Sequence, residues 1–435
     1  MRHLHVFSNQ THVGYLARGD AAPHRFAYEQ GCQPQDAISL AMPCPDPGVA
    51  SSAFFDATRP TLLHPIFDMN MPEGALKNTL LAIYGKALPV LDDYALLGVT
   101  GLHGIGKVRC HPLPTLPHPA ISGMGLSSLL KARGTQGLFH QLLQQYAQFS
   151  GVSGVQPKIL VQDDGSMKSS DHSPINASDR TTVQGATHIV KSFDAEKYPD
   201  MALNEFLCLK AARKAGLATP EVDLANDGGL LVIQRFDLRD GGTHRGFEDG
   251  CALAGLQSSL KYDGSYEQLA KTFRGYLSPS TPHPLLDFFK SVVLSCTVRN
   301  GDAHRKNFGV LYDDATACIH LAPTFDVITS TVYVESDMMA LTLNGSKRWP
   351  GFAQLRAFGT ATCNLPPAVT AEAMSQVAEA VADVRSDLAV AGGVGAAMLT
   401  QWESGLHSTH SKSVTVATPA EQDKTPEPPK VGRGR

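Results

Sequence analysis

Residues 285–330 constrain the fold more than any other part of the chain. An apolar run at 285–296 has helical spacing and leads directly into a sharply polar loop at 300–307. A short apolar piece at 308–312 is typical of a strand, and Asp326 follows between two apolar residues. A buried helix, a polar loop and a second carboxylate in this order predict one cleft that the loop and Asp326 line together.

The polar loop carries residues suited to phosphoryl transfer. Asp302 and Asn307 stand in the D-x-x-x-x-N relation of a kinase catalytic loop, in which the Asp orients the attacking hydroxyl and the Asn holds a metal ion. Asp326 occupies the place of a second Mg²⁺-binding carboxylate. Fixed carboxylates, an amide and Mg²⁺ suit this reaction because its transition state spreads charge over several oxygens. In isolation the loop fits an ordinary turn equally well, with Asp302 as a helix-end cap and His304 as a surface imidazole.

Length and composition indicate a globular protein of several domains. A chain of 435 residues can form two or three domains, and 43% hydrophobic with 18% charged residues is typical of soluble proteins. The net charge of −4 argues against a generally basic nucleic-acid binder. The N-terminus lacks an apolar segment, and no run approaches ~18 apolar residues. We therefore expect a cytoplasmic protein that does not span a membrane.

The eight cysteines are scattered along the chain without a C-x-x-C pair. Cys208 and Cys296 fall within apolar helical patterns, which favours their burial. We therefore expect reduced and mostly buried thiols rather than a disulfide framework or a zinc site.

Residues 1–120 predict a small α+β module. Residues 4–16 have the pattern of a β-hairpin, and a third strand is expected shortly after it. His3, His5 and His12 could approach a metal ion, but surface histidines at strand ends are the simpler interpretation.

A Gly-rich segment at 101–107 of this module fits the phosphate-binding pattern G-x-x-x-x-G-K. However, Val108 replaces the Ser or Thr whose hydroxyl ligates Mg²⁺ in such a loop. Three prolines shortly afterwards also exclude the helix that should follow. The segment is therefore interpreted as a turn.

Residues 121–245 carry the pattern of a nucleotide-binding lobe. A Gly/Ser turn at 150–158 links an expected helix to a strand, and its small residues let the main chain lie over phosphates. Lys191 ends a short β-branched strand, and Glu205 lies on the next helix. This order predicts the ion pair that holds a lysine against the α- and β-phosphates.

The next apolar strand is expected at 230–233, and Gln234, Arg235 and Phe236 follow it. In a kinase this is the hinge between the lobes, where backbone groups meet the edge of adenine. Beyond it, from 246 to 405, the composition favours helices, which are expected at 266–276, 285–299 and 370–390. Residues 406–435 lack apolar periodicity and are expected to form a disordered tail.

Six segments occur in an order that points to one family. They are SGVSGVQPK (150–158), THIVK (187–191), NEFLCL (204–209), QRFD (234–237), NGDAHRKN (300–307) and PTFDV (323–327). Together with the N-terminal hairpin and the PEG of residues 72–74, they resemble the HipA-type serine/threonine kinases, toxins of bacterial toxin–antitoxin pairs. The resemblance covers nearly the whole chain except the tail. It implies an α+β, two-lobed protein-kinase-like fold with an extra N-terminal α/β subdomain and an all-helical C-terminal lobe.

The resemblance also implies roles for individual residues. Asp302 would be the catalytic base, Asn307 and Asp326 would bind Mg²⁺, and Glu205 would pair with Lys191. The residues implied to contact ATP are Ser153, Gly154, Val155, Gln156, Pro157, Lys158, Lys191, Gln234, Arg235, Phe236, His304, Arg305, Lys306, Asn307 and Asp326.

Partners and regulation are implied in the same way. Family members phosphorylate an aminoacyl-tRNA synthetase, are held in check by a small DNA-binding antitoxin, and autophosphorylate a serine of the Gly-rich loop. This sequence departs from the pattern at Gly151, which stands at the first serine position. Ser153 is therefore the expected acceptor, with Ser150 just outside the loop. Gln234 stands where Glu is frequent, an exchange that backbone contacts to adenine would survive.

Two other functions share some of these features. A small-molecule kinase of the aminoglycoside-phosphotransferase sort has the same loop but needs an acidic pocket, and the helical part shows no carboxylate cluster beyond Asp287 and Glu267. A non-catalytic corepressor subunit, bound to an antitoxin on DNA, would not need an intact set of Lys191, Asp302 and Asp326.

Overall fold

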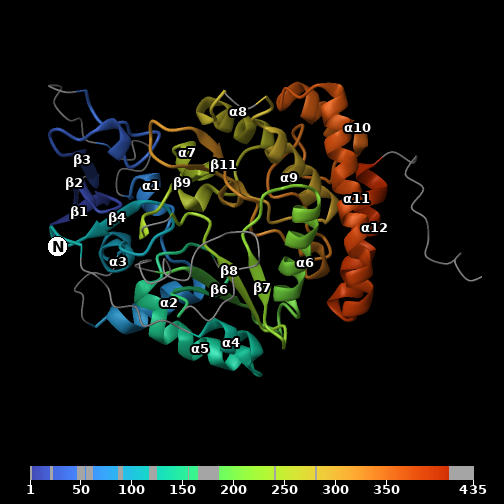
Figure 1. Ribbon diagram of the computed structural model, residues 1–435, viewed down its shortest axis with the longest axis horizontal. Helices are drawn as coiled ribbons and strands as arrows, with labels where there is room; N and C mark the ends of the chain where they lie inside the picture. The colour runs from blue at the N-terminus through green and yellow to red at the C-terminus, as the bar shows by residue number, and fades with distance from the viewer. Residues whose placement is uncertain are drawn as a thin grey trace, which may run out of the picture.

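The chain folds into three successive parts along its longest axis (Figure 1). The N-terminal sheet lies at one end, a second sheet lies in the middle, and the long helices α11 and α12 close the other end. The computed structural model describes residues 2–19, 23–46, 54, 62–86, 92–116, 125–154, 156–164, 186–239, 242–279 and 282–410. Val155 and most of the predicted tail lie outside these residues.

The N-terminal part is built on an antiparallel sheet in the order β3-β2-β1-β4. Asn9 adopts a positive φ of 53° in the turn between β1 and β2, as a two-residue hairpin loop requires. This confirms the predicted hairpin. The elements are β1 (His3–Ser8), β2 (Thr11–Ala17), β3 (Arg25–Tyr28), β4 (Val108–His111), α1 (Pro65–Asp68), α2 (Gly74–Tyr84) and α3 (Asp93–Thr100).

The middle part contains a second antiparallel sheet, in the order β5-β6-β8-β7. Leu4 and Val6 of β1 belong to the same buried cluster as Ile159 of β5 and Val190 of β6. The first two parts therefore share one hydrophobic core. The elements of the middle part are α4 (Leu126–Lys131), α5 (Thr135–Tyr146), β5 (Lys158–Val161), β6 (His188–Ser192), α6 (Met201–Lys214), β7 (Val222–Leu224) and β8 (Leu230–Gln234).

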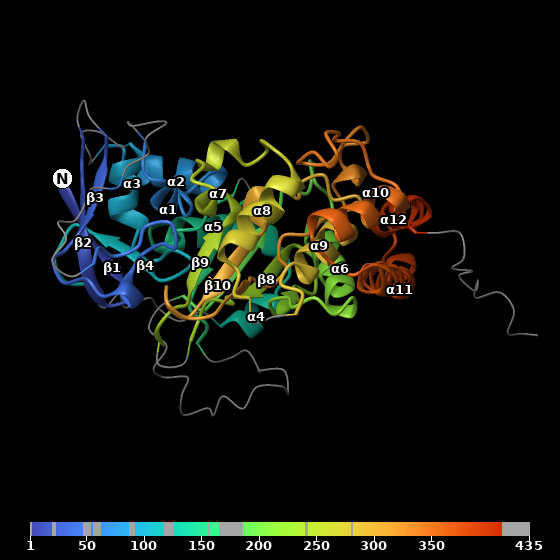
Figure 2. The ribbon, with the colours of Figure 1, turned by 90° about the horizontal axis from the view of Figure 1, so that it is seen from above.

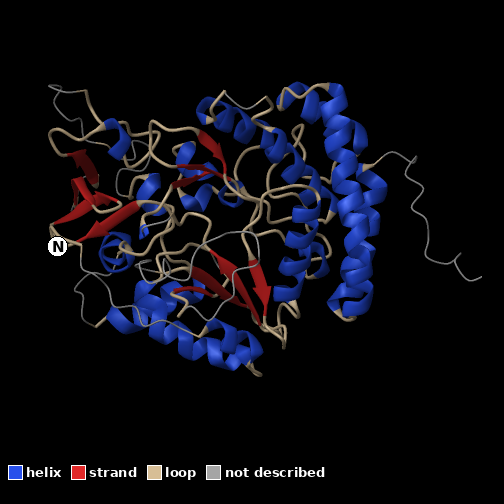
Figure 3. Ribbon diagram, viewed as in Figure 1, coloured by secondary structure: helices blue, strands red, loops and turns tan. Residues whose placement is uncertain are grey.

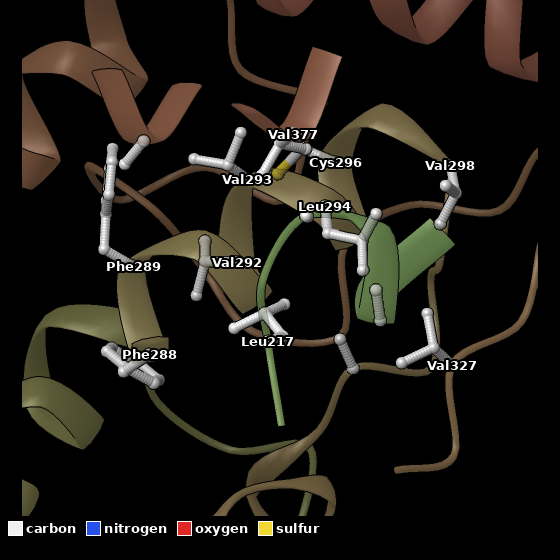
Figure 4. Close-up of a cluster of buried hydrophobic side chains, with 14 of the residues drawn as sticks. Leu217, Phe288, Phe289, Val292, Val293, Leu294, Cys296, Val298, Val327 and Val377 are labelled. Carbon is white, nitrogen blue, oxygen red and sulfur yellow. The ribbon is translucent and has the colours of Figure 1, made fainter. Parts of the chain in front are cut away.

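The C-terminal part is mostly helical and packs around α9 (Figures 3 and 4). Every residue from Phe288 to Thr297 on α9 is buried, and the helix packs against α11 and α12. This part also holds a three-stranded sheet, β11-β10-β9, so it is not all-helical as predicted. Its elements are β9 (Gly246–Asp249), α7 (Gly250–Leu253), α8 (Tyr266–Tyr276), α9 (Leu286–Thr297), β10 (Gly309–Tyr312), β11 (Ile319–Leu321), α10 (Phe352–Ala357), α11 (Pro367–Ala391) and α12 (Val394–Thr409).

Short helical turns connect these elements. The 3₁₀ turns are Pro34–Asp36, Ala147–Phe149, Ser258–Leu260, Arg305–Asn307 and Ser330–Val332, and a π-helical turn, Phe358–Thr362, follows α10. Helix α12 continues to Thr409, past the residue where the tail was predicted to begin, because Trp402 and Thr409 are buried against the C-terminal core. None of the described helices has the length and apolar character needed to cross a membrane.

Two predictions about the N-terminal part have different outcomes. Cys32 and Cys44 form a disulfide, so the expectation that all thiols are reduced is wrong for this pair. In a phosphate-binding loop a helix would follow Lys107, but here the strand β4 follows it. The Lys107 side chain is buried, and its Nζ donates to the Gln35 carbonyl oxygen at 3.1 Å. The Gly-rich segment before it is therefore a structural turn.

Candidate functional site

A cleft of about 190 Å³ lies where the three parts meet. Its apolar wall is formed mainly by Ile105, Val152, Ile189, Ile233, Phe236, Phe247 and Phe325. Its charged lining comprises Lys158, Lys191, Arg235, Asp237, Asp249, Lys261, Asp302, Lys306 and Asp326. An apolar wall facing several convergent charges is what a nucleotide site requires.

Lys191 links the middle and C-terminal parts through two carboxylates. Its Nζ donates to Glu205 Oε1 at 2.6 Å and to Asp326 Oδ1 at 2.7 Å. Lys191 lies on β6, inside the sheet, and Glu205 on α6 is fully buried. Asp326 has a positive φ of 58°, a conformation that Asp tolerates better than most residues and that turns its carboxylate toward the lysine. The predicted ion pair is therefore present, and Asp326 completes it.

The electrostatics of this group follow from burial and mutual attraction. Burial alone would lower the pKa of Lys191, but the two carboxylates outweigh it and raise that pKa. Burial raises the pKa of Glu205. Burial would do the same to Asp326, but the nearby Lys191 and Lys158 hold the pKa of this carboxyl below its ordinary value. Lys191 and Asp326 are therefore charged at neutral pH.

Asp302 lies in the polar loop that α9 delivers to the cleft. Arg299, with a positive φ of 60°, ends the helix and turns the chain into this loop. The Asp302 carbonyl oxygen accepts a hydrogen bond from Asn307 Nδ2 at 2.8 Å, and its N–H donates to Asn300 Oδ1 at 3.1 Å. Burial raises the pKa of the Asp302 carboxyl to about 6. Asp302 and Asn307 thus lie together as their spacing predicts.

The side chains of His304, Arg305 and Lys306, in the same loop, point in different directions. Burial lowers the pKa of His304 to about 3, so its imidazole is neutral, and its Nε2 lies 4.0 Å from the Asp302 carboxylate. Lys306 lines the cleft. Arg305 does not line it: its guanidinium donates to the Asp263 carbonyl oxygen and to Gln268. Arg305 therefore holds the loop on the side that faces away from the cleft. It does not lie where it could make the predicted contact with ATP.

The Gly-rich segment after α5 covers the cleft with Ser153, Gly154, Gln156 and Lys158. Gly154 has a φ of 121°, and a Cβ there would clash with the Lys158 ammonium. Burial lowers the pKa of Lys158. Of the remaining predicted contacts in this segment, Pro157 is not part of the lining.

The two candidate phosphate acceptors of this segment have different environments. Ser150 is fully buried, and its hydroxyl donates to the Tyr146 carbonyl oxygen and accepts from the Leu160 N–H. Ser153 instead faces the cleft. The intervening Gly151 pairs with Gly104, and a Cβ at residue 151 would lie 2.8 Å from a carbonyl oxygen. The departure from the family pattern at this position therefore has a steric cause.

A second charged group joins the Gly-rich segment to both other parts. Glu73, the residue before α2, accepts a hydrogen bond from Ser153 Oγ at 2.7 Å. Its other oxygen lies 3.2 Å from Lys261 Nζ. Lys306 Nζ donates to Ser153 Oγ at 2.6 Å and lies 3.7 Å from the Glu73 carboxylate. Neither Glu73 nor Lys261 was assigned a role from the sequence, although Glu73 lies within the noted PEG.

The residues predicted to form the hinge, Gln234, Arg235 and Phe236, line the cleft. The N–H groups of Gln234 and Arg235 already donate to neighbouring carbonyl oxygens. The Arg235 guanidinium is buried against Asp237, with Nη2 2.6 Å from the carboxylate. Phe236 lies with its ring centroid 5.4 Å from Phe247 and 5.6 Å from Phe325. This aromatic group, of which only Phe236 was predicted, offers an apolar surface for a planar base.

The donor set near the loop suits Mg²⁺. Because Asn307 Nδ2 is bonded to a carbonyl, its amide oxygen is left for a cation, and Asp326 adds a carboxylate. The described residues contain no cluster of three His, Cys, Asp or Glu side chains that could enclose a metal. Mg²⁺ does not need such a cage, since it is usually held by one or two carboxylates plus substrate phosphates and water.

Comparison with known proteins agrees with this geometry. Residues 150–385, more than half of the chain, match the HipA-like C-terminal domain, and residues 4–111 match the HipA N-terminal domain. The Sinorhizobium fredii protein Y4mE is 27% identical over 359 residues, which cover 75% of this chain and 81% of that protein.

Two Shewanella oneidensis comparisons extend the likeness. The serine/threonine-protein kinase toxin HipA is 24% identical over 202 residues, 42% of this chain and 43% of that protein. A chain of the solved complex of HipA, HipB and operator DNA has a TM-score of 0.67 at 17% identity and covers 93% of this chain and 95% of that one. The fold is therefore that of a HipA-type, kinase-like protein, and the chain belongs to the HipA family.

Proposed function

We propose that the protein is an ATP- and Mg²⁺-dependent serine/threonine protein kinase that acts as the toxin of a toxin–antitoxin pair. The observation that carries this proposal is the Lys191 ammonium, which bridges Glu205 and Asp326 in the cleft that Asp302 also lines. An ammonium held on a sheet, opposite two acids and an amide from the helical part, is the constellation that phosphoryl transfer needs.

The residues act as follows. Lys191, with Lys158, binds the phosphates, and the Phe236 group receives the base. Asn307 and Asp326 would hold Mg²⁺, which when bound would offset negative charge on the phosphate oxygens. Asp302 orients the acceptor hydroxyl and accepts its proton, and its pKa of about 6 keeps it ionised at pH 7.

The acceptor and partners are proposed from the family. The substrate is a serine of a translation protein such as an aminoacyl-tRNA synthetase, and transfer to it arrests growth. A small DNA-binding antitoxin of the HipB kind restrains the toxin and supplies its contact to DNA; a HipB stands beside HipA in the similar solved complex. Autophosphorylation uses Ser153, because Ser153 lines the cleft whereas Ser150 is fully buried and does not.

The test is incubation of the purified chain with γ-labelled ATP and a bacterial lysate, followed by identification of the labelled proteins. Asp302→Asn and Asp326→Asn should each slow transfer about 10³-fold or more, because they remove the base or a metal ligand. Asp387→Asn is the matched control, since Asp387 pairs with Lys210 on the surface.

Three results would contradict the proposal. Full activity of either cleft variant would remove the assigned roles. Label on an aminoglycoside, with none on any protein, would indicate a small-molecule kinase. Growth arrest that survives Asp302→Asn would indicate a non-catalytic corepressor.

A further inference from the structure

The carboxylate of Asp302 already has a hydroxyl bound to it. Tyr262 donates its phenolic hydrogen to Asp302 Oδ1 at 2.6 Å, and both residues line the cleft. The Tyr262 ring packs edge-on against His304, with ring centroids 5.0 Å apart, and Lys261 Nζ lies 5.6 Å from the Tyr262 centroid. This contact involves no residue of the Lys191 group.

The main chain around Tyr262 is fixed, whereas its side chain is 43% exposed. On one side of Tyr262, the Lys261 carbonyl oxygen accepts a hydrogen bond from the Arg305 N–H at 3.1 Å. On the other side, the Asp263 carbonyl oxygen accepts from Arg305 Nε at 2.7 Å. Arg305 thus ties the Tyr262 segment to the catalytic loop.

A base must form a hydrogen bond of about 2.6–3.2 Å to the hydroxyl from which it takes a proton. Tyr262 holds that position on Asp302 Oδ1, which an acceptor serine or a water molecule would otherwise occupy. We propose that Tyr262 is a cap on Oδ1 of Asp302: the phenol occupies this oxygen, in a side chain that is 36% exposed, until the hydroxyl of a protein acceptor displaces it. This inference rests on the kinase function proposed above.

The reaction that the cap prevents is ATP hydrolysis. Without the cap, a water oxygen could bond to the γ-phosphorus while the bond from that phosphorus to the ADP oxygen breaks, and the water proton would pass to Asp302. Burial and the adjacent Asp302 raise the pKa of Tyr262, so the phenol stays protonated and remains a hydrogen-bond donor. Tyr262 is in this account a positioning residue that makes phosphoryl transfer depend on a protein acceptor.

The experiment measures ADP release by the full chain with ATP and Mg²⁺ and no protein acceptor. Tyr262→Phe should raise it about tenfold, the size expected when a hydrogen bond to a charged group is lost, and Tyr262→Ala should raise it further. Tyr276→Phe is the matched control, because the Tyr276 hydroxyl bonds to the Leu253 carbonyl oxygen outside the cleft. Thermal melting of each variant checks that it is folded.

A pH profile separates a cap from a merely structural contact. The Tyr262 hydrogen bond lowers the pKa of Asp302, as do Lys261 and Lys158, whereas burial and Asp326 raise it and the neutral His304 stands alongside. The acid limb of ADP release should therefore move to higher pH in Tyr262→Phe and stay in place in Tyr276→Phe.

Three outcomes would overturn the cap. They are unchanged ADP release in both Tyr262 variants, loss of protein phosphorylation and ADP release together in Tyr262→Phe, and phosphate found on Tyr262 of the wild-type chain. Failure of the kinase proposal is distinct, because the wild-type chain would then label no protein of the lysate with γ-labelled ATP, or Asp302→Asn would label as much protein as the wild type.

Discussion

The cleft contains two groups of charges that differ in how they are built. In the Lys191 group, an ammonium and two carboxylates are 2.6 and 2.7 Å apart, and the lysine and Glu205 are buried. In the Glu73 group, two ammonium groups and a serine hydroxyl surround a carboxylate that is about a quarter exposed. The first group lies within the kinase-like core, and the second joins that core to the N-terminal part.

We infer from this difference that the Lys191 group is rigid and that the Glu73 group rearranges more easily. The Glu73 carboxylate is about a quarter exposed, so water and salt partly screen its contacts with Lys261 and Lys306. Removing one member of the Lys191 group would leave a buried charge without a partner, which is costly. We therefore expect the Lys191 group to determine whether transfer can occur, and the Glu73 group to determine how firmly the Gly-rich segment covers the cleft.

The largest effect is expected from Lys191→Met. Transfer should fall about 10³-fold or more because the phosphates lose their main cation. The variant should also lose about 3–5 kcal/mol of unfolding free energy, since Glu205 is left buried and unpaired. Enzyme kinetics and urea denaturation measure the two effects.

Lys210→Met is the matched control, because Lys210 pairs with Asp387 where both side chains are well exposed. A Lys191→Met variant with wild-type stability would contradict the inference that the Lys191 group is rigid and buried. Lys191→Met combined with Glu205→Met should regain part of the stability without regaining activity.

Glu73→Gln should have a smaller effect, and this effect should be on the KM for ATP and not on the rate of transfer. We expect the KM for ATP to rise about fivefold with little change in kcat, because the amide of Gln can still accept from Ser153 but loses the charge attraction to Lys261, about 1 kcal/mol. Steady-state kinetics at low and high salt measure it.

High salt should raise the wild-type KM toward that of Glu73→Gln, since salt screens exposed charges. Glu403→Gln is the control, because Glu403 pairs with Arg385 on the outer helices. A loss confined to kcat would show that Glu73 acts in the chemistry and does not hold the loop.

The same two groups show what the sequence could predict. Lys191 and Glu205 follow one another on a strand and the next helix, and Asp302 and Asn307 share one short loop. Local spacing fixes the relative placement of such residues, so the predicted contacts are present. A strand was predicted at 308–312, where β10 lies, but the rest of the sheet in the C-terminal part was missed because its strands are short and β9 precedes most of the helices.

Glu73 and the aromatic pair Phe247 and Phe325 could not be placed in this way. Glu73 and its partner Lys261 are 188 residues apart, and no periodic pattern reports how two separate parts dock. The predicted ATP contact Arg305 shows the converse limit. Membership in a catalytic loop does not say which side of the loop a side chain takes, and Arg305 points toward Asp263.

Acid should affect Asp302 more than the Lys191 group. Because burial raises the pKa of Asp302 to about 6, the ionised fraction of this base falls as pH drops through that value. Transfer should therefore decline about tenfold between pH 7.5 and pH 5. Lys191 and Asp326 should remain charged throughout, since Lys191 has a raised pKa and Asp326 a lowered one. Flat kcat across this range would exclude Asp302 as the base.

The smallest effect is expected from a pair of serine variants beside the Glu73 group. Ser150→Ala should lose about 1 kcal/mol of unfolding free energy, because it removes two buried hydrogen bonds, yet phosphate should remain on the loop. Ser153→Ala should leave stability nearly unchanged and abolish the loop phosphate. Mass spectrometry after incubation with ATP, together with urea denaturation, measures both. Phosphate that persists in Ser153→Ala and disappears in Ser150→Ala would reverse the assignment, and Ser150 would then have to leave its buried position to react.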